Sequence, residues 1–237
     1  INMLLGMLVG GGIFLLITLV GGIFYGKEAM GFGDVKLMGA LGLFDYRSAN
    51  FNQHDRTFNP QKIKVAYAGA LHIKKNPFLI QLTEVLKSWD LYIFGNKNGL
   101  QGWKENPRVH HQGFMASDDF IHSVDADFGL VWDGDSLETC SGVFGEYLKW
   151  NSPHKVSFYL RSALPVIIWQ EAAVASIIEK EGAGFAIKDP QELNERLKTL
   201  TPTEYHQMKE NAKRLAKELN SGHFLRQALQ EYFTSEV

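Results

Sequence analysis

Hydrophobic and polar positions divide the chain into two parts with different patterns. Residues 1–25 contain no charged side chain and almost no polar one. From residue 62 onward, short apolar runs alternate with segments that are apolar on one face only. The first pattern is long enough for a membrane-spanning helix, which needs about 20 apolar residues. The second is typical of an α/β domain in which strands and helices follow one another.

The alternating part predicts a parallel sheet covered on both faces, which is a Rossmann-like α/β fold. We expect it to fill residues 62–237, after a linker over residues 45–61 and a membrane-associated segment over residues 1–44. Strands are expected at residues 62–69, 91–95, 109–113, 128–132, 165–169 and 184–187, and helices at residues 76–89, 116–124, 152–163 and 172–182. A long loop through Gly145 and three helical segments at the C-terminus complete the prediction.

Composition and charge narrow the class of function. A hydrophobic share of 45% with 21% charged residues is ordinary for a globular protein. The formal net charge of -2 argues against a general nucleic-acid-binding protein. The single cysteine, Cys140, cannot form an internal disulfide, which fits a reducing compartment.

The apolar N-terminal part is interpreted as a membrane anchor that leaves the rest of the chain in the cytoplasm. A signal peptide fits less well, because no basic segment precedes the apolar run. A buried helix of a soluble domain is the alternative, but six glycines in this run would weaken a helix in water. The flanking charges, such as Lys27 and Glu28, are too few to fix the membrane orientation.

The segment after the apolar run reads Gly-Phe-Gly-Asp-Val-Lys-Leu over residues 31–37. It resembles the type IV prepilin peptidase family, polytopic membrane aspartyl proteases in which such a sequence carries one catalytic aspartate. The resemblance implies that role for Asp34. An aspartyl mechanism needs a second carboxyl group, and only Glu28, which does not match the family pattern, precedes Asp34. Residues 1–44 are therefore expected to be an inactive fragment of such an enzyme.

Several candidate site residues follow the predicted strands. Ligands of open parallel sheets bind beyond the carboxyl ends of the strands, where this chain places Gly69, Gly95, Gly113 and the segment 133–135. A glycine there serves an ordinary turn as readily as it serves a ligand. The carboxylates of residues 133–138 and Glu146 suggest a metal site only weakly, so we expect a solvated loop and no metal.

A more specific site is predicted at the start of the helix over residues 152–163. Asn151 or Ser152 can cap this helix, and Pro153 suits its first position. His154 and Lys155 then fall in the first turn, where the helix dipole favours an anion. A lysine there is unfavourable unless an anion binds to it, which predicts a phosphate site. The alternative is a solvated lysine that points away from the helix end.

A second resemblance covers about residues 44–237. The ordered series Val131-Trp-Asp-Gly-Asp-Ser, Thr139-Cys-Ser-Gly, Gly145-Glu-Tyr-Leu-Lys and Pro153-His-Lys is similar to a glycosyltransferase group. This group includes a streptococcal glucosyltransferase of serine-rich adhesins and related galactofuranosyltransferases. The resemblance implies a GT-B fold, a UDP-sugar donor, a saccharide or glycoprotein acceptor, and no metal or other cofactor.

The same resemblance assigns roles to individual residues. It implies that Gly69 adjoins the phosphates and that Lys155 neutralises the diphosphate. It also places Ser157 and Tyr159 in the matched segment, with His154, and it implies that Gly113 and Phe114 lie near the base.

The chain departs from that group in its N-terminal part, where a GT-B enzyme carries its acceptor domain. We therefore expect a join between two unrelated proteins near residues 41–46, and a donor-binding half of a glycosyltransferase. The C-terminal segment 223–233 would expose apolar area, which favours association into oligomers. The alternatives are a membrane-anchored nucleotide-sugar-binding module that works with a partner and, less consistent with the residues, a prepilin aspartyl peptidase.

Overall fold

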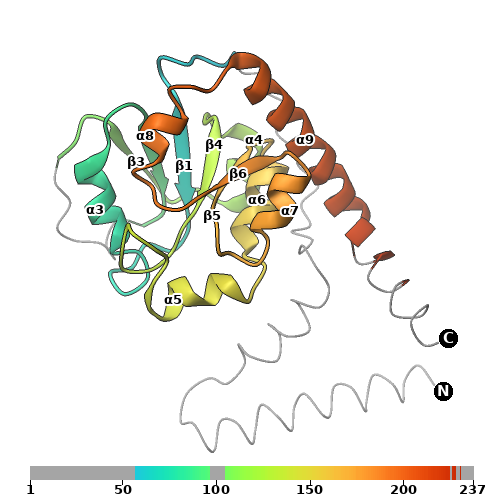
Figure 1. Cartoon of the computed structure of the whole chain (residues 1–237), viewed down its shortest axis with the longest axis horizontal. Coiled ribbons are helices and arrows are strands. Elements are labelled where there is room, and N and C mark those ends of the chain that lie inside the picture. The colour runs from blue at the N-terminus through green and yellow to red at the C-terminus, as the bar shows by residue number, and fades with distance from the viewer. Residues whose placement is uncertain (1–56, 97–104, 225, 228–229, 231–237) are drawn as a thin grey trace, which may run out of the picture.

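The computed structural model describes residues 57–96, 105–224, 226–227 and 230. These residues form a six-stranded parallel sheet with the strand order β3-β2-β1-β4-β5-β6 (Figure 1). This is a Rossmann-like order, so the predicted fold class is confirmed for this part of the chain. The strands are β1 (Lys64–Ala68), β2 (Asp90–Phe94), β3 (Val109–Gly113), β4 (Phe128–Val131), β5 (Val166–Trp169) and β6 (Gly184–Ile187).

Helices cover both faces of the sheet. In Figure 1, α3 and α8 lie on one side, and α4, α6, α7 and α9 lie on the other. The helices are α3 (Phe78–Val85), α4 (Ser117–Ser123), α5 (Gly142–Glu146), the 3-10 turn η2 (Tyr147–Lys149), α6 (His154–Arg161), α7 (Ala175–Lys180), α8 (Leu193–Arg196) and α9 (Pro202–Ser221).

The sheet forms because its strands are apolar on both faces. All four residues of β4 and of β5 are buried, as expected for parallel strands between two helical layers. Three tryptophans, Trp89, Trp132 and Trp169, are almost fully buried in the same core. Helices and strands therefore share one continuous core.

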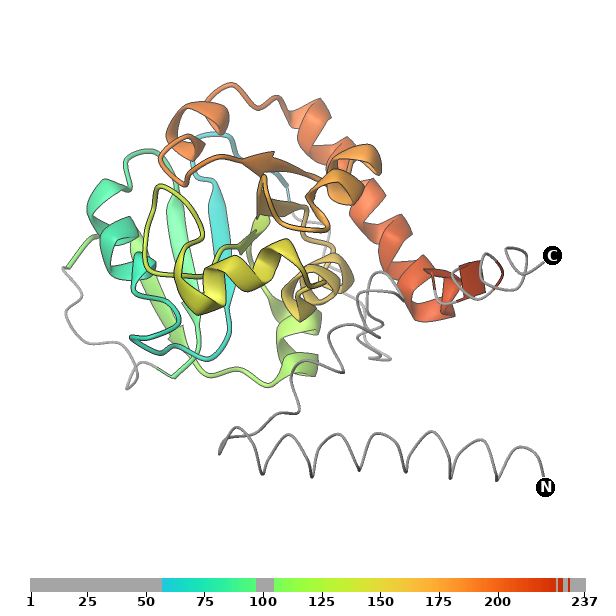
Figure 2. The same ribbon diagram turned by 60° about the horizontal axis from the view of Figure 1, so that its bottom comes forward.

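The long helix α9 has clear signals at both ends. The side chain of Thr201 accepts a hydrogen bond from the backbone N–H of Glu204, and Glu204 bonds back to the Thr201 backbone. Pro202 occupies the first position, and Gly222 ends the helix in the left-handed conformation. The helix packs against α6 and extends past the sheet (Figure 2).

Two local predictions are corrected by the structure. The helix expected over residues 152–163 begins at His154, because Pro153 has an extended ψ of 134° and is the N-cap rather than the first helical residue. Neither Asn151 nor Ser152 caps it through a side chain. The segment expected as a long loop through Gly145 contains α5 and η2.

The predictions for the N-terminal part fall outside the described residues. These are the membrane helix, Asp34, the peptidase-like fragment over residues 1–44 and most of the linker. Within the described ranges, the structure has no helix that is long and apolar enough to cross a membrane. Phe58, near the end of the predicted linker, is packed on the domain, because its ring stacks on that of Tyr205 with centroids 4.2 Å apart.

Candidate functional site

A cavity of about 280 Å³ opens at the carboxyl ends of β1 and β2 and the start of α6. The strand order reverses beside β1, since β2 lies on one side of it and β4 on the other. In sheets of this kind the crevice at such a reversal is the usual ligand site. The cavity is lined by Ala68, Gly69, Ala70, Phe94, Gly95, Phe114, Met115, Ser117, Phe120, His154, Lys155 and Phe158.

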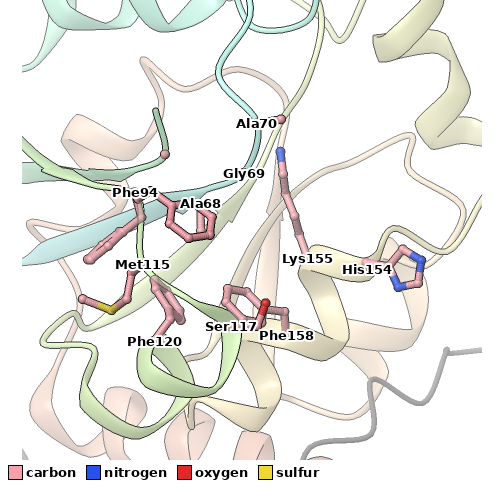
Figure 3. Close-up of a pocket in the computed structure, with 12 residues that line it drawn as sticks. Ala68, Gly69, Ala70, Phe94, Met115, Ser117, Phe120, His154, Lys155 and Phe158 are labelled. Atoms are coloured by element: carbon pink, nitrogen blue, oxygen red, sulfur yellow. The ribbon is translucent and has the colours of Figure 1, made fainter. Parts of the chain in front are cut away.

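One wall of the cavity is aromatic (Figure 3). Phe120 contacts Phe94 edge to face, with ring centroids 4.8 Å apart, and stacks on Phe158 at 4.5 Å. Phe114, which follows β3, is 80% exposed at the same cavity. These rings offer a flat apolar surface of the kind that nucleobases and other planar groups bind.

The opposite wall is the side chain of Lys155, which extends from the start of α6 toward Gly69 and Ala70 (Figure 3). Its ammonium donates hydrogen bonds to Asp133 Oδ1 at 2.9 Å and to the hydroxyl of Tyr67 at 2.8 Å. The Tyr67 hydroxyl donates to the same carboxylate oxygen at 2.8 Å, and Asn76 Nδ2 donates to it at 3.1 Å. A buried charge pair with additional hydrogen-bond donors is thus built into the cavity wall.

Burial shifts the titration of these groups. Burial lowers the pKa of Lys155, and Lys75 lowers it further, while the Asp133 carboxylate opposes both effects. Burial and the charge of Asp133 together raise the pKa of Tyr67 well above its usual range. Tyr67 is therefore a neutral hydrogen-bonding partner of Lys155 and Asp133.

The backbone after β1 is held close to the lysine. Gly69 has a φ of +153°, and a Cβ atom added there would lie 3.4 Å from Lys155 Cε. The N–H of the preceding Ala68 donates to the hydroxyl of Tyr159 at 2.8 Å. This glycine allows the chain to pass over the lysine at a backbone angle that other residues rarely adopt.

The structure brings together some of the predicted site residues. Gly69, Phe114, His154 and Lys155 line the cavity, although His154 points away from the aromatic wall (Figure 3). Gly113 ends β3 directly before Phe114. Ser157 and Tyr159 are fully buried and do not line the cavity. A role for Tyr159 beside the ligand is thus indirect, through its bond to Ala68.

The structure contradicts one of the two alternatives considered for Lys155, the solvated lysine, while the phosphate site stays a prediction. The side chain is only 12% exposed, so it is not a solvated lysine, and its anionic partner is the protein's own Asp133. The loop expected to be solvated around Asp133 is likewise buried at that residue. Within the described ranges, no three His, Cys, Asp or Glu side chains are grouped to hold a metal ion.

Sequence reasoning missed Tyr67 and Asn76 as parts of the site, and it named the segment 133–135 among the candidates without pairing Asp133 with Lys155. Asp133 was expected in a solvated loop, although it lies two residues after β4, a strand that is buried along its whole length. Its position at the carboxyl end of a central strand was a usable signal. Tyr67 and Asn76 carry no such signal, since a tyrosine inside a strand and an asparagine before a helix are common.

The buried phenol of Tyr159 predicts a specific response to alkaline pH. Burial raises its pKa above the ordinary value of 10.0, so ionisation is easier in the unfolded chain. The stabilising contribution is full below pH 10.0 and is lost as pH rises toward the higher folded value. Above pH 10.0 the free energy of unfolding should fall about 1.4 kcal/mol per pH unit less steeply in Tyr159→Phe than in the wild type.

Urea unfolding at several pH values from about 9 to 11 measures this difference. Tyr67 is unchanged in both proteins, so its own contribution to the slope cancels. Tyr147→Phe, at an exposed ring, is the control and should keep the wild-type slope. Equal slopes for the wild type and Tyr159→Phe would contradict the prediction.

Comparison with known proteins identifies the family. Residues 65–232 match the model of the Glucosyltransferase 3-like C-terminal domain. The chain belongs to this family. Over 190 residues it is 36% identical to the β-1,6-galactofuranosyltransferase WbbI of Escherichia coli, covering 80% of this chain and 54% of that protein. Over 104 residues it is 30% identical to Glucosyltransferase 3 of Streptococcus parasanguinis, covering 44% of this chain and 29% of that protein.

Solved structures of lower sequence identity also resemble this Glucosyltransferase 3-like domain. The structure is similar to Anabaena HepE in complex with UDP-glucose, with a TM-score of 0.48 and 14% identity, covering 73% of this chain and 49% of HepE. The chain spans about half the length of the E. coli relative and less of the streptococcal one. Neither the family model nor these two relatives point to a prepilin peptidase.

Proposed function

We propose that residues 57–230 form the donor-binding domain of a GT-B glycosyltransferase, which transfers a sugar from a UDP-sugar to a saccharide or glycoprotein acceptor. Membership of the Glucosyltransferase 3-like family supports the reaction class. The observation that supports a diphosphate-containing donor is the buried ammonium of Lys155 at the cavity wall. The membrane anchor, the cytoplasmic location and oligomer formation remain predictions.

The Lys155 ammonium retains capacity to bind an anion. It has three N–H donors, and two are used by Asp133 and Tyr67. Beyond these two bonds, the residues that the structure describes offer the ammonium only the face of the Tyr67 ring, whose centroid is 4.1 Å away, and Lys155 lines the cavity. A buried donor without an acceptor is unfavourable, and a phosphate oxygen in the cavity would relieve this.

The surroundings of the ammonium suit a diphosphate. Lys155 is in the first turn of α6, where the helix dipole adds positive potential. The backbone at Gly69 carries no side chain that would keep phosphates from the ammonium.

The aromatic wall suits the uracil end of the donor. Phe94, Phe120 and Phe158 form an apolar surface next to the lysine, and Phe114 is exposed at the same opening. A base stacked there would place its diphosphate toward the start of α6. Specific recognition of uracil would then rely on backbone groups near Gly113 and Phe114.

These groups would assist glycosyl transfer by stabilising the leaving group. The bond between the sugar's anomeric carbon and the phosphate oxygen breaks, and an acceptor hydroxyl oxygen forms a new bond to that carbon. The acceptor hydroxyl releases its proton, and UDP leaves with an additional negative charge. A fixed ammonium and a helix N-terminus next to that charge stabilise it electrostatically, without requiring a metal. The acceptor would be bound outside the described residues.

The direct test is UDP binding by the wild type and by Lys155→Ala, measured by calorimetry. We expect about a tenfold to hundredfold loss of affinity, since hydrogen bonds to charged groups contribute about 1.5–3 kcal/mol. Lys149→Ala is the matched control, because Lys149, at the end of η2, pairs with Glu146 and Glu171 and does not line the cavity. Equal affinity of the wild type and Lys155→Ala would remove Lys155 from the site.

A transfer assay on the same samples distinguishes an active transferase from a nucleotide-sugar-binding module that needs a partner. Release of UDP from a UDP-sugar in the presence of acceptor would show an active transferase. UDP binding without turnover, with activity restored by a second protein, would support the nucleotide-sugar-binding module instead.

A further inference from the structure

We propose that Asp133 is a positioning residue, which holds the Lys155 ammonium protonated and in place at the cavity wall before the donor arrives. This inference rests on the proposed function, in which Lys155 binds the diphosphate. Asp133 would not touch the donor itself. It would act through the lysine alone.

The geometry fixes both ends of the charge pair. Asp133 Oδ1 accepts hydrogen bonds from Lys155 at 2.9 Å, from Tyr67 at 2.8 Å and from Asn76 at 3.1 Å. The carboxylate is 9% exposed. Because three donors from β1, from the segment before α3 and from α6 meet at one oxygen, the carboxylate has little freedom to move. The lysine bonded to it is held equally firmly.

A fixed lysine matters because its side chain is long and flexible. A free lysine loses about 0.5–1.5 kcal/mol of rotamer freedom when a ligand immobilises it. Here that cost is met during folding, since Lys155 Nζ also bonds to the Tyr67 hydroxyl and lies 4.1 Å from the centroid of its ring. The third N–H is left for a phosphate, so the donor can bind without displacing Asp133.

The surroundings of Lys155 would favour loss of its proton if no negatively charged partner were present. The titratable groups that act on Lys155 are Asp133 after β4, Tyr67 on β1, Lys75 before α3 and Cys140 before α5. Burial and Lys75 favour loss of the lysine's proton, and the pKa of Lys155 is lowered accordingly. Asp133 is the main opposing charge. Without it, the site would more readily hold a neutral amine, which binds phosphate poorly.

The test compares the pH dependence of UDP affinity in the wild type and in Asp133→Asn. Calorimetry from about pH 7.5 to 9.5 keeps the phosphates of UDP fully ionised. We expect the affinity of Asp133→Asn to begin falling at a lower pH than that of the wild type, approaching tenfold per pH unit. A uniform loss at every pH would mean a purely structural role, and tighter binding at every pH would mean that Asp133 competes with the phosphate. Either result overturns the proposal.

Asp135→Asn is the matched control. Asp135 lies two residues further on and bonds to the Ser141 hydroxyl rather than to Lys155, so its pH profile should follow the wild type. A shifted profile for Asp135→Asn would show that any loop charge has this effect and would overturn the specific role of Asp133.

A measurement on the wild type keeps the proposal testable if Asp133→Asn does not fold. Calorimetry near pH 8 in two buffers of different ionisation enthalpy counts the protons taken up on UDP binding. We expect uptake close to zero, because the lysine is already charged. Uptake approaching one proton per UDP would overturn the proposal.

The outcome for this inference can be distinguished from that for the proposed function. If Lys155→Ala binds UDP as the wild type does, the proposed function fails. If Lys155→Ala loses affinity but Asp133→Asn shows the wild-type pH profile, only the role of Asp133 fails.

Discussion

Replacing Gly129 by alanine is expected to destabilise the domain by about 3 kcal/mol or more. Gly129 lies in β4 and pairs with both β1 and β5, at the centre of the sheet. A Cβ atom at this position would lie only 2.2–2.7 Å from three ring carbons of Tyr159. That ring is fully buried and its hydroxyl is bonded to Ala68, so it cannot move aside without losing core contacts. Overpacking of this kind ordinarily costs about 1–3 kcal/mol, and a rigid ring against a central strand should be at the upper end or beyond.

Urea unfolding of Gly129→Ala measures the loss, and a second background isolates its cause. In Tyr159→Ala the ring is absent, so adding Gly129→Ala should cost about 1 kcal/mol or less beyond the loss from Tyr159→Ala alone. If Gly129→Ala costs the same in both backgrounds, the clash with Tyr159 is not the reason. Because Tyr159 supports Ala68 next to Gly69, the folded fraction of Gly129→Ala should also bind UDP more weakly.

The sheet was predictable because its signal is local and redundant. β3 and β6 occupy the same residues as the predicted strands, and the other four differ only at their ends. Each strand is an apolar run bounded by turn residues, which is the pattern of a strand buried on both faces. The alternation with helices then implied parallel pairing, which the structure shows for every adjacent pair of strands.

The helix boundaries and the segment between β4 and α6 were less predictable. The helix expected over residues 76–89 ends at Val85, because Leu86 has an extended ψ of 122° that nothing in its sequence requires. The helix α5 depends on tertiary contacts, since Gly145 packs against the backbone of Cys140 and Asp133. Glycine-rich sequence predicts a loop unless such contacts are known.

Only the part of the candidate site that lies in one short motif could be predicted from the sequence. The segment 152–155 indicated a positively charged helix start, and Lys155 does line the cavity. Its partners come from distant parts of the chain, since Tyr67 and Asp133 are 66 residues apart. No periodicity or motif relates such positions. Their proximity follows from the order of β1 and β4 in the sheet, which the sequence pattern alone does not fix.

The contributions of Lys155 and Asp133 to the free energy of unfolding should depend strongly on each other. Breaking a buried ion pair by removing one partner costs about 3–5 kcal/mol, because the other charge is left buried without compensation. Lys155→Met and Asp133→Asn should each approach this loss. Methionine follows the shape of the lysine stem, and asparagine follows that of the carboxylate. The loss in free energy of unfolding relative to the wild type therefore reports mainly on charge.

The double variant Lys155→Met/Asp133→Asn tests whether charge imbalance, rather than lost packing, causes these losses. Removing both charges leaves no uncompensated ion, and the amide oxygen introduced by Asp133→Asn can still accept from Tyr67 and Asn76. The double variant should therefore be more stable than the sum of the two losses predicts. A coupling energy of about 1–3 kcal/mol from urea unfolding would support this. Additive losses would mean that the two charges do not compensate each other. A stable double variant that no longer binds UDP would then show that the pair is retained for its charge at the cavity and not for the fold.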